Sequence, residues 1–168
     1  MVALHCDGSL SDDKAGFGGL IRDDSGDPLA AFVGIGDDLS VLSMELMAIY
    51  RGISLCVDKG FYDVSIRSNS KLAADILNGV IIGPWQILTL KSKIHIKARQ
   101  KSKKKNIKAR LLRSKEFIHA WREQNQPADF MASFPTDPSG ILWEPESFPP
   151  ELAILIKQDK EFVTYYRM

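Results

Sequence analysis

The feature that most constrains the fold of this chain is a change in the spacing of its apolar residues near Ser40. Before that point, turn residues separate three apolar runs, which predicts a meander of β-strands over residues 2–6, 15–23 and 29–35. Beyond it, apolar residues recur at helical spacing over 42–57, with Ser40 as the expected N-cap. A helix that follows a meander has to bury its apolar stripe on the sheet, so the pattern predicts an α/β fold.

The rest of the chain alternates strands with helices. We expect a fourth strand over 62–67, a helix that ends at Asn78, and an amphipathic helix after Trp85. A fifth strand is expected over 116–121, followed by a last core helix with Asn125 as its N-cap. This order of elements predicts a mixed sheet.

The length and composition indicate one globular domain. The 168 residues are 45% apolar and 26% charged. We assign residues 1–134 to the domain, with a basic segment over 84–115. Residues 135–168 hold five of the eight prolines, which predicts an extended C-terminal tail that packs on the domain. Only a short helix near 151–158 is expected in that tail.

Neither a membrane segment nor a secretory signal is expected from the sequence. No apolar run approaches the ~20 residues that span a bilayer, and the first residues lack the order of a signal peptide. The two cysteines, Cys6 and Cys56, stand in apolar surroundings without the spacing of a metal site. We therefore expect reduced core cysteines in an intracellular protein of the nucleus or cytoplasm.

The net charge of +1 hides a strong asymmetry along the chain. Between Asp75 and Glu116 there are 12 Lys and Arg and no acidic residue, so the other 10 basic residues share the rest of the chain with all 21 acidic ones. Such a segment predicts contact with a polyanion, although a solvated helix, a mobile loop or a localisation signal would also explain it. The predicted nucleic-acid contacts are Lys101, Lys103, Lys104, Lys105, Lys108 and Arg110.

Several residues able to do chemistry stand at the ends of predicted elements. Asp7 follows the first strand, Glu45 lies among apolar neighbours at the start of the first helix, and Asp129 lies early in the last core helix. Carboxylates in such positions can hold a metal ion or act as a general base. Each also has an ordinary explanation. Asp7 can be a turn residue, and Glu45 and Asp129 can be first-turn acids that the helix dipole stabilises. His119 closes the fifth strand, where a histidine without a chemical role is common.

The motifs around these residues resemble the ribonuclease H family, and within it the reverse-transcriptase-like domains that are common in plants and derive from retrotransposons. They are Asp-Gly-Ser at 7–9, Ala-Gly-Phe-Gly-Gly-Leu-Ile-Arg-Asp at 15–23, Glu45-Leu46, Ser68-Asn69-Ser70, and the stretch from His119 to Asp129. The resemblance covers nearly the whole chain. It implies a five-stranded mixed sheet flanked by helices, and an endonuclease that cleaves RNA paired with DNA.

The family's chemistry uses two Mg²⁺ ions, for which Mn²⁺ can substitute, held by carboxylates at one edge of the sheet. By resemblance, Asp7 bridges both ions, while Glu45 and Asp129 each hold one side. The histidine that the family places ten residues before the last acid is His119 here, and it assists proton transfer or product release.

Two departures from the family pattern bear on activity. Asn69 stands where the family has a catalytic Asp, and Arg67 stands where a Glu is common. An amide offers an oxygen but no charge, so we expect weakened metal binding and reduced cleavage. The alternatives are a non-catalytic nucleic-acid-binding module and a retroelement fragment without function. We expect a monomer that binds an RNA/DNA hybrid or another duplex.

Overall fold

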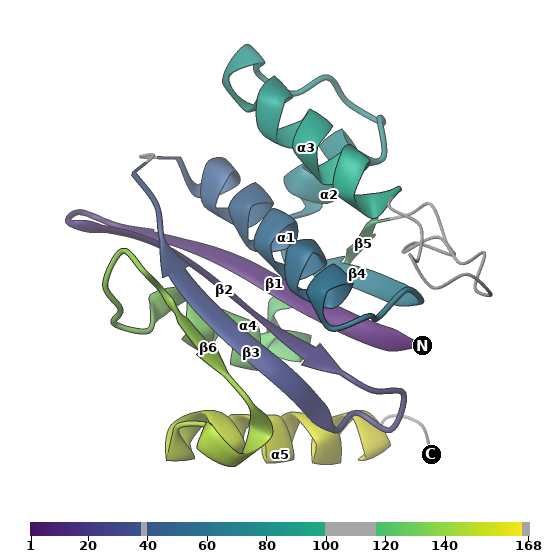
Figure 1. Ribbon diagram of the computed structural model, residues 1–168, viewed down its shortest axis with the longest axis vertical. Coiled ribbons are helices and arrows are strands. Elements are labelled where there is room, and N and C mark those ends of the chain that lie inside the picture. The colour runs from purple at the N-terminus through teal and green to yellow at the C-terminus, as the bar shows by residue number, and fades with distance from the viewer. Residues whose placement is uncertain (38–39, 100–116, 166–168) are drawn as a thin grey trace.

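Strands of this chain form a six-stranded sheet in the order β5-β4-β1-β2-β3-β6 (Figure 1). The structure is a computed structural model that describes residues 1–37, 40–99 and 117–165. Its strands are β1 Val2–Ser11, β2 Lys14–Arg22, β3 Pro28–Ile35, β4 Val64–Ser68, β5 Phe117–His119 and β6 Ile141–Trp143. β1 pairs in parallel with β4, and β4 with β5, whereas the pairs β1–β2, β2–β3 and β3–β6 are antiparallel. The expected α/β class and mixed sheet are therefore confirmed.

Helices cover both faces of the sheet. The α-helices are α1 Val41–Asp58, α2 Lys71–Leu77, α3 Leu88–Ala98, α4 Gln126–Ser133 and α5 Pro150–Tyr165, and three 3₁₀ turns are η1 Trp85–Ile87, η2 Arg122–Gln124 and η3 Pro145–Ser147. One apolar core lies between the sheet and α1, α2 and α3. A second, smaller core lies between the other face and α4 and α5 (Figure 1).

The helix that follows the meander begins and ends as the sequence predicts. The Ser40 side chain accepts a hydrogen bond from the Ser43 amide at 3.4 Å, which satisfies one free donor of the first turn. Gly60, at a φ of 77°, follows its C-terminus. The buried face of α1 includes Leu46, Ile49 and Ile53.

Two glycines allow helices to touch the central strands. A Cβ on Gly8 would lie 2.4 Å from the Glu45 amide nitrogen on α1. A Cβ on Gly18, the partner of Asp7 in β2, would lie 2.6 Å from the Met131 side chain on α4. Gly8 therefore lets α1 approach β1 next to Asp7, and Gly18 lets α4 approach β2 directly opposite Asp7.

The C-terminal part differs from the expectation in two respects. Residues 141–143 form β6 and pair with β3, so the sheet has six strands where five were expected. This strand is too short to show an alternating pattern in the sequence. It is reached through Gly140, at a φ of 71°, whose Cβ would meet the Val33 carbonyl oxygen at 2.6 Å.

The last helix is also longer than the turn or two expected near 151–158. α5 continues to Tyr165, and its Leu152 and Ile156 side chains are buried against the smaller core. Asp159 extends the buried face by a further turn, because it forms a 2.6 Å ion pair with Arg22 of β2. A buried acid on a helix cannot be recognised from the sequence when its partner is 137 positions away.

The structure bears on three further expectations. Cys6 and Cys56 are buried and unpaired, as predicted. No described helix is long and apolar enough to cross a membrane. The six predicted nucleic-acid contacts, Lys101, Lys103, Lys104, Lys105, Lys108 and Arg110, lie outside the described residues.

Candidate active site

The candidate site lies where β4 ends and β1 continues. β4 pairs with β1 up to Ser68, which is opposite Cys6, whereas β1 continues beside β2 to Ser11. The expectation that the first strand ends at Cys6 is therefore wrong, because the hairpin extends it. What ends there is the pairing with β4. Asp7 is thus the first β1 residue without a β4 partner within the described part of the sheet.

Four predicted site residues meet at this point. The side chains of Glu45, Asn69 and Asp129 all lie close enough to the Asp7 carboxyl group to change its pKa. α1 brings Glu45 from one face of the sheet, α4 brings Asp129 from the other, and Asn69 directly follows β4. Because no β4 residue pairs with Asp7, side chains from both faces can reach it. Asp7 and Glu45 are only 2% and 4% exposed.

The two buried acids share a proton near neutral pH. Burial raises the pKa of Glu45 to about 9, and the charge of Asp7 adds to the rise. Burial also raises the pKa of Asp7 to about 6, although hydrogen bonds with Glu45 and Asn69 oppose the rise. Glu45 is therefore the protonated partner and donates to the Asp7 carboxylate. Ser68 Oγ donates to Glu45 Oε2 at 3.0 Å and fixes its orientation.

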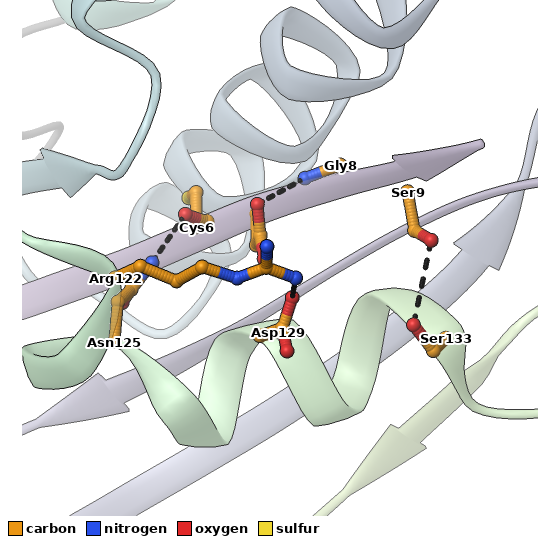
Figure 2. Close-up of polar contacts among 8 residues, drawn as sticks. Cys6, Gly8, Ser9, Arg122, Asn125, Asp129 and Ser133 are labelled. Carbon is orange, nitrogen blue, oxygen red and sulfur yellow. Dashed lines mark hydrogen bonds and ion pairs between the residues drawn. The ribbon is translucent and has the colours of Figure 1, made fainter.

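Asn125 ties the segment before α4 to β1. Its side chain is fully buried, and Nδ2 donates to the Cys6 carbonyl oxygen at 2.9 Å (Figure 2). Because the amide nitrogen donates there, Oδ1 is the acceptor for His5 Nδ1 at 3.2 Å. Burial and two nearby arginines lower the pKa of His5 to about 3, so the ring is neutral. Asn125 stands at the N-cap of α4 as expected, but its side chain makes no cap hydrogen bond.

Arg122 forms an ion pair with Asp129 that the sequence did not reveal. Its Nη2 lies 2.8 Å from Asp129 Oδ1 (Figure 2). The two side chains are 73% and 38% exposed, so this pair faces solvent at the mouth of the site. The pairing with Asp129 raises the pKa of Arg122, and the charge of Asp7 contributes to the rise.

The donor atoms suit a hard divalent cation, but their arrangement does not. Carboxylates and the Asn69 amide oxygen are oxygen ligands, and Asn69 Oδ1 is buried without a hydrogen-bond donor. Nevertheless, no three His, Cys, Asp or Glu side chains among the described residues are placed to hold a metal ion. Asp129, the third acid, is bound to Arg122 instead.

His119 and Arg67 lie beside this cluster. His119 ends β5 opposite Ser68, and its ring packs edge-on against Trp121 with centroids 5.4 Å apart. The described contacts of His119 include none with the carboxylates. Arg67 pairs with His5 in the sheet, two residues before Asp7, and its Nε atom is buried without a hydrogen-bond partner.

Sequence reasoning missed Ser68, Arg122 and the side-chain role of Asn125. Ser68 precedes Asn69 directly, and a hydroxyl beside a predicted ligand is a signal that could have been used. Arg122 and Asn125 lie in the loop before Asp129. Their contacts depend on how that loop folds back over β1, which no local pattern specifies.

The strand order and the helices on both faces define a ribonuclease H-like fold. The N-terminal RNase H domain of rv2228c from Mycobacterium tuberculosis superposes with a TM-score of 0.66 at 18% identity, over 78% of this chain and 89% of that chain. LC11-RNase H1 in complex with an RNA/DNA hybrid gives 0.65 at 24% identity, over 78% and 93%. RNase H1 from the halophilic archaeon Halobacterium salinarum gives 0.64 at 18% identity, over 78% and 93%.

Sequence comparison agrees with the fold. Residues 5–134 match the family model described as reverse transcriptase-like, so the chain belongs to the reverse transcriptase-like family. No curated protein matches the sequence. The expected ribonuclease H-like family is therefore confirmed.

Proposed function

We propose that this chain is a nucleic-acid-binding domain that binds RNA/DNA hybrids and retains a weakened, metal-dependent hydrolase site. The observation that carries the proposal is the cluster around Asp7, where Glu45, Asn69 and Asp129 all reach one carboxyl group. Buried acids held this close together are costly to stability, so such a cluster is typical of a site that binds a cation. The fold supports the substrate class, since one structure with it is a complex with an RNA/DNA hybrid.

In this proposal Asp7, Glu45 and Asp129 would hold Mg²⁺ or Mn²⁺, and Asn69 would contribute an oxygen without a charge. The cation would neutralise the charge that develops when a phosphodiester is cleaved. Asp129 must first leave Arg122, and Glu45 must lose its proton, because a carboxylate binds a cation only when ionised. Both requirements weaken the site, in line with the missing charge at position 69.

The second candidate function is a binding module without catalysis. It is favoured by the absence of a metal-holding group among the described side chains, and by the two departures at Arg67 and Asn69. Under either function the wider expectations rest on the sequence alone. They are a monomer, a nuclear or cytoplasmic location, and an origin in a plant retrotransposon.

Cleavage of an end-labelled RNA/DNA hybrid in Mg²⁺ or Mn²⁺ tests the first function. The Asn69→Asp variant adds the missing carboxylate beside Asp7 and should cleave at least ~10-fold faster than the wild type, an effect of only ~1.4 kcal/mol on the barrier. If Arg67 opposes cation binding, the gain should be larger in Asn69→Asp combined with Arg67→Glu.

The matched control is Asp129→Asn in each background, which removes one acid without changing size. It should abolish the gain, because the acids act on the same cation. Hybrid binding measured in parallel separates the two functions. Variants that bind hybrid but never cleave it, even with both charges restored, would establish the binding module instead.

A further inference from the structure

Trp121 is an exposed aromatic residue that has no part in the proposed hydrolase site but lies beside it. It is 67% exposed, and it directly follows Ala120, whose amide donates to the Ser68 carbonyl oxygen at 2.8 Å. The next residue, Arg122, reaches Asp129 at the mouth of the site (Figure 2). The indole therefore belongs to the loop that borders the acid cluster.

The backbone around Trp121 is held in place, and its ring has a neighbour that orients it. The Trp121 carbonyl oxygen accepts a hydrogen bond from the Gln124 amide at 2.9 Å, and the buried Asn125 side chain ties the end of the loop to β1. The ring packs edge-on against that of His119, with centroids 5.4 Å apart. A ring held in this way loses little freedom when a ligand stacks on it, so its exposed surface is prepared for binding.

The surroundings of Trp121 favour a single flat ligand over a protein partner. The three residues that follow it in the loop, Arg122, Glu123 and Gln124, are all exposed and polar. A protein partner usually covers a contiguous apolar patch, whereas one nucleobase needs only one face of the ring. The basic segment of the chain already predicts a polyanionic partner, and nucleic acid is the polyanion that carries flat rings.

We propose that Trp121 is a stacking platform for an unpaired nucleobase, so that the domain binds a hybrid with an adjoining single-stranded segment more tightly than a blunt hybrid. The inference rests on the proposed function, since it requires a nucleic acid at this site. A base inside a duplex is stacked on both faces and offers neither to a side chain. An unpaired base has a free face, and its stacking on an aromatic ring depends little on which base it is.

The test measures the affinity of the whole chain for three labelled ligands in EDTA by fluorescence anisotropy. They are a blunt RNA/DNA hybrid, the same hybrid with thymidine overhangs on the DNA strand, and that hybrid with abasic residues in the overhangs. The last two carry the same phosphates and differ only in their bases, so the contribution of phosphate contacts cancels between them. The wild type should bind the thymidine overhangs at least ~5-fold more tightly than the abasic ones, the lower end of the effect of one stacked base.

Variants at position 121 separate stacking from other contributions to affinity. Trp121→Ala should lose the preference for thymidine overhangs and keep the wild-type affinity for the blunt and abasic ligands. Trp121→Phe keeps an aromatic ring and should keep most of the preference, whereas Trp121→Leu keeps only apolar surface and should lose it. The control is Leu142→Ala, which removes a 54% exposed apolar side chain from β6, at the opposite edge of the sheet from β5, and should leave all three affinities unchanged.

The two proposals fail in different ways. A wild type that binds none of the three ligands overturns the proposed function and the stacking platform with it. A wild type that binds all three without preferring thymidine over abasic overhangs overturns this inference alone, and so does a Trp121→Ala variant that retains the preference. A lower melting temperature of Trp121→Ala, with an equal loss of affinity for all three ligands, would assign Trp121 a structural role and also overturn the inference.

Discussion

Glu45 is a buried acid that stays protonated in the folded state because water cannot reach it and Asp7 lies beside it. In the folded chain its pKa is about 9, against 4.5 for an unperturbed glutamate. Between these two values the folded state binds a proton that the unfolded state has lost. Stability therefore falls as the pH rises through this window, and is fully retained only below it.

The Glu45→Gln substitution should remove this loss of folding stability at rising pH. Glutamine can still donate to Asp7 and accept from Ser68, but it cannot ionise. From pH 6.5 to pH 8.5, above the Asp7 pKa of about 6, the variant should gain at least ~1.4 kcal/mol in unfolding free energy relative to the wild type. Urea denaturation of both proteins at the two pH values measures this difference in unfolding free energy. The control is Glu146→Gln, at an exposed position, and an equal gain there would contradict the prediction.

The acidic residues of the site could be predicted from the sequence, but the residues that contact them could not. Asp7, Glu45 and Asp129 stand at element ends, and such positions can be read from periodicity and turn residues. Arg122 could not be found in this way, because its partner Asp129 lies on the next helix and the contact depends on a non-repetitive loop. The same holds for Asn125, which has the composition of a helix cap but donates to β1.

At the scale of elements, the position of α1 depends on the absence of a side chain at Gly8. The added Cβ of Gly8→Ala would lie 2.4 Å from the Glu45 amide nitrogen and 2.6 Å from the Met44 carbonyl carbon. These are backbone atoms, so the whole helix would have to move. We expect Gly8→Ala to lower the unfolding free energy by ~1–3 kcal/mol, the usual range for overpacking. Urea denaturation measures this loss.

The same displacement should also separate Glu45 from Asp7. The fall in stability between pH 6.5 and 8.5 should therefore be shallower in Gly8→Ala than in the wild type. Gly36→Ala is the matched control, because its Cβ would meet only the flexible end of the Met44 side chain, at 2.4 and 2.7 Å. Gly36→Ala should lower the unfolding free energy by less than ~1 kcal/mol. It should leave the pH dependence of stability unchanged.

Long periodic elements were predicted and short or isolated ones were not. α1 and the three strands of the meander carry repeated apolar positions, which is why the sequence indicates them. β6 has three residues and is defined by its pairing with β3, so nothing in its own composition marks it. The extra length of α5 depends on Asp159. The burial of this acid is explained only by its ion pair with Arg22 of β2, which is far from it in the sequence.

At the scale of the whole molecule, the charge is divided between two parts of the chain. The described layers hold nearly all of the acidic residues, several of them around Asp7, while 12 basic residues lie between Asp75 and Glu116. An acidic cluster alone repels nucleic acid. Affinity for a polyanion is therefore expected to come mainly from the basic segment.

Replacing Lys103, Lys104 and Lys105 with alanine tests this division of charge. Each phosphate that a lysine neutralises contributes ~0.9 to the slope of log K against log salt, so the slope for a hybrid should flatten by up to ~2.7. The control replaces Lys59, which follows the C-terminus of α1, together with Lys157 and Lys160 on α5, and so removes the same net charge from the rest of the chain. Because screening is similar for both variants, a local contact predicts a smaller change in the control than in the basic triple variant. Equal slopes for the two variants would mean that the affinity follows net charge alone, and a basic triple variant with the wild-type slope would remove the segment from the interface.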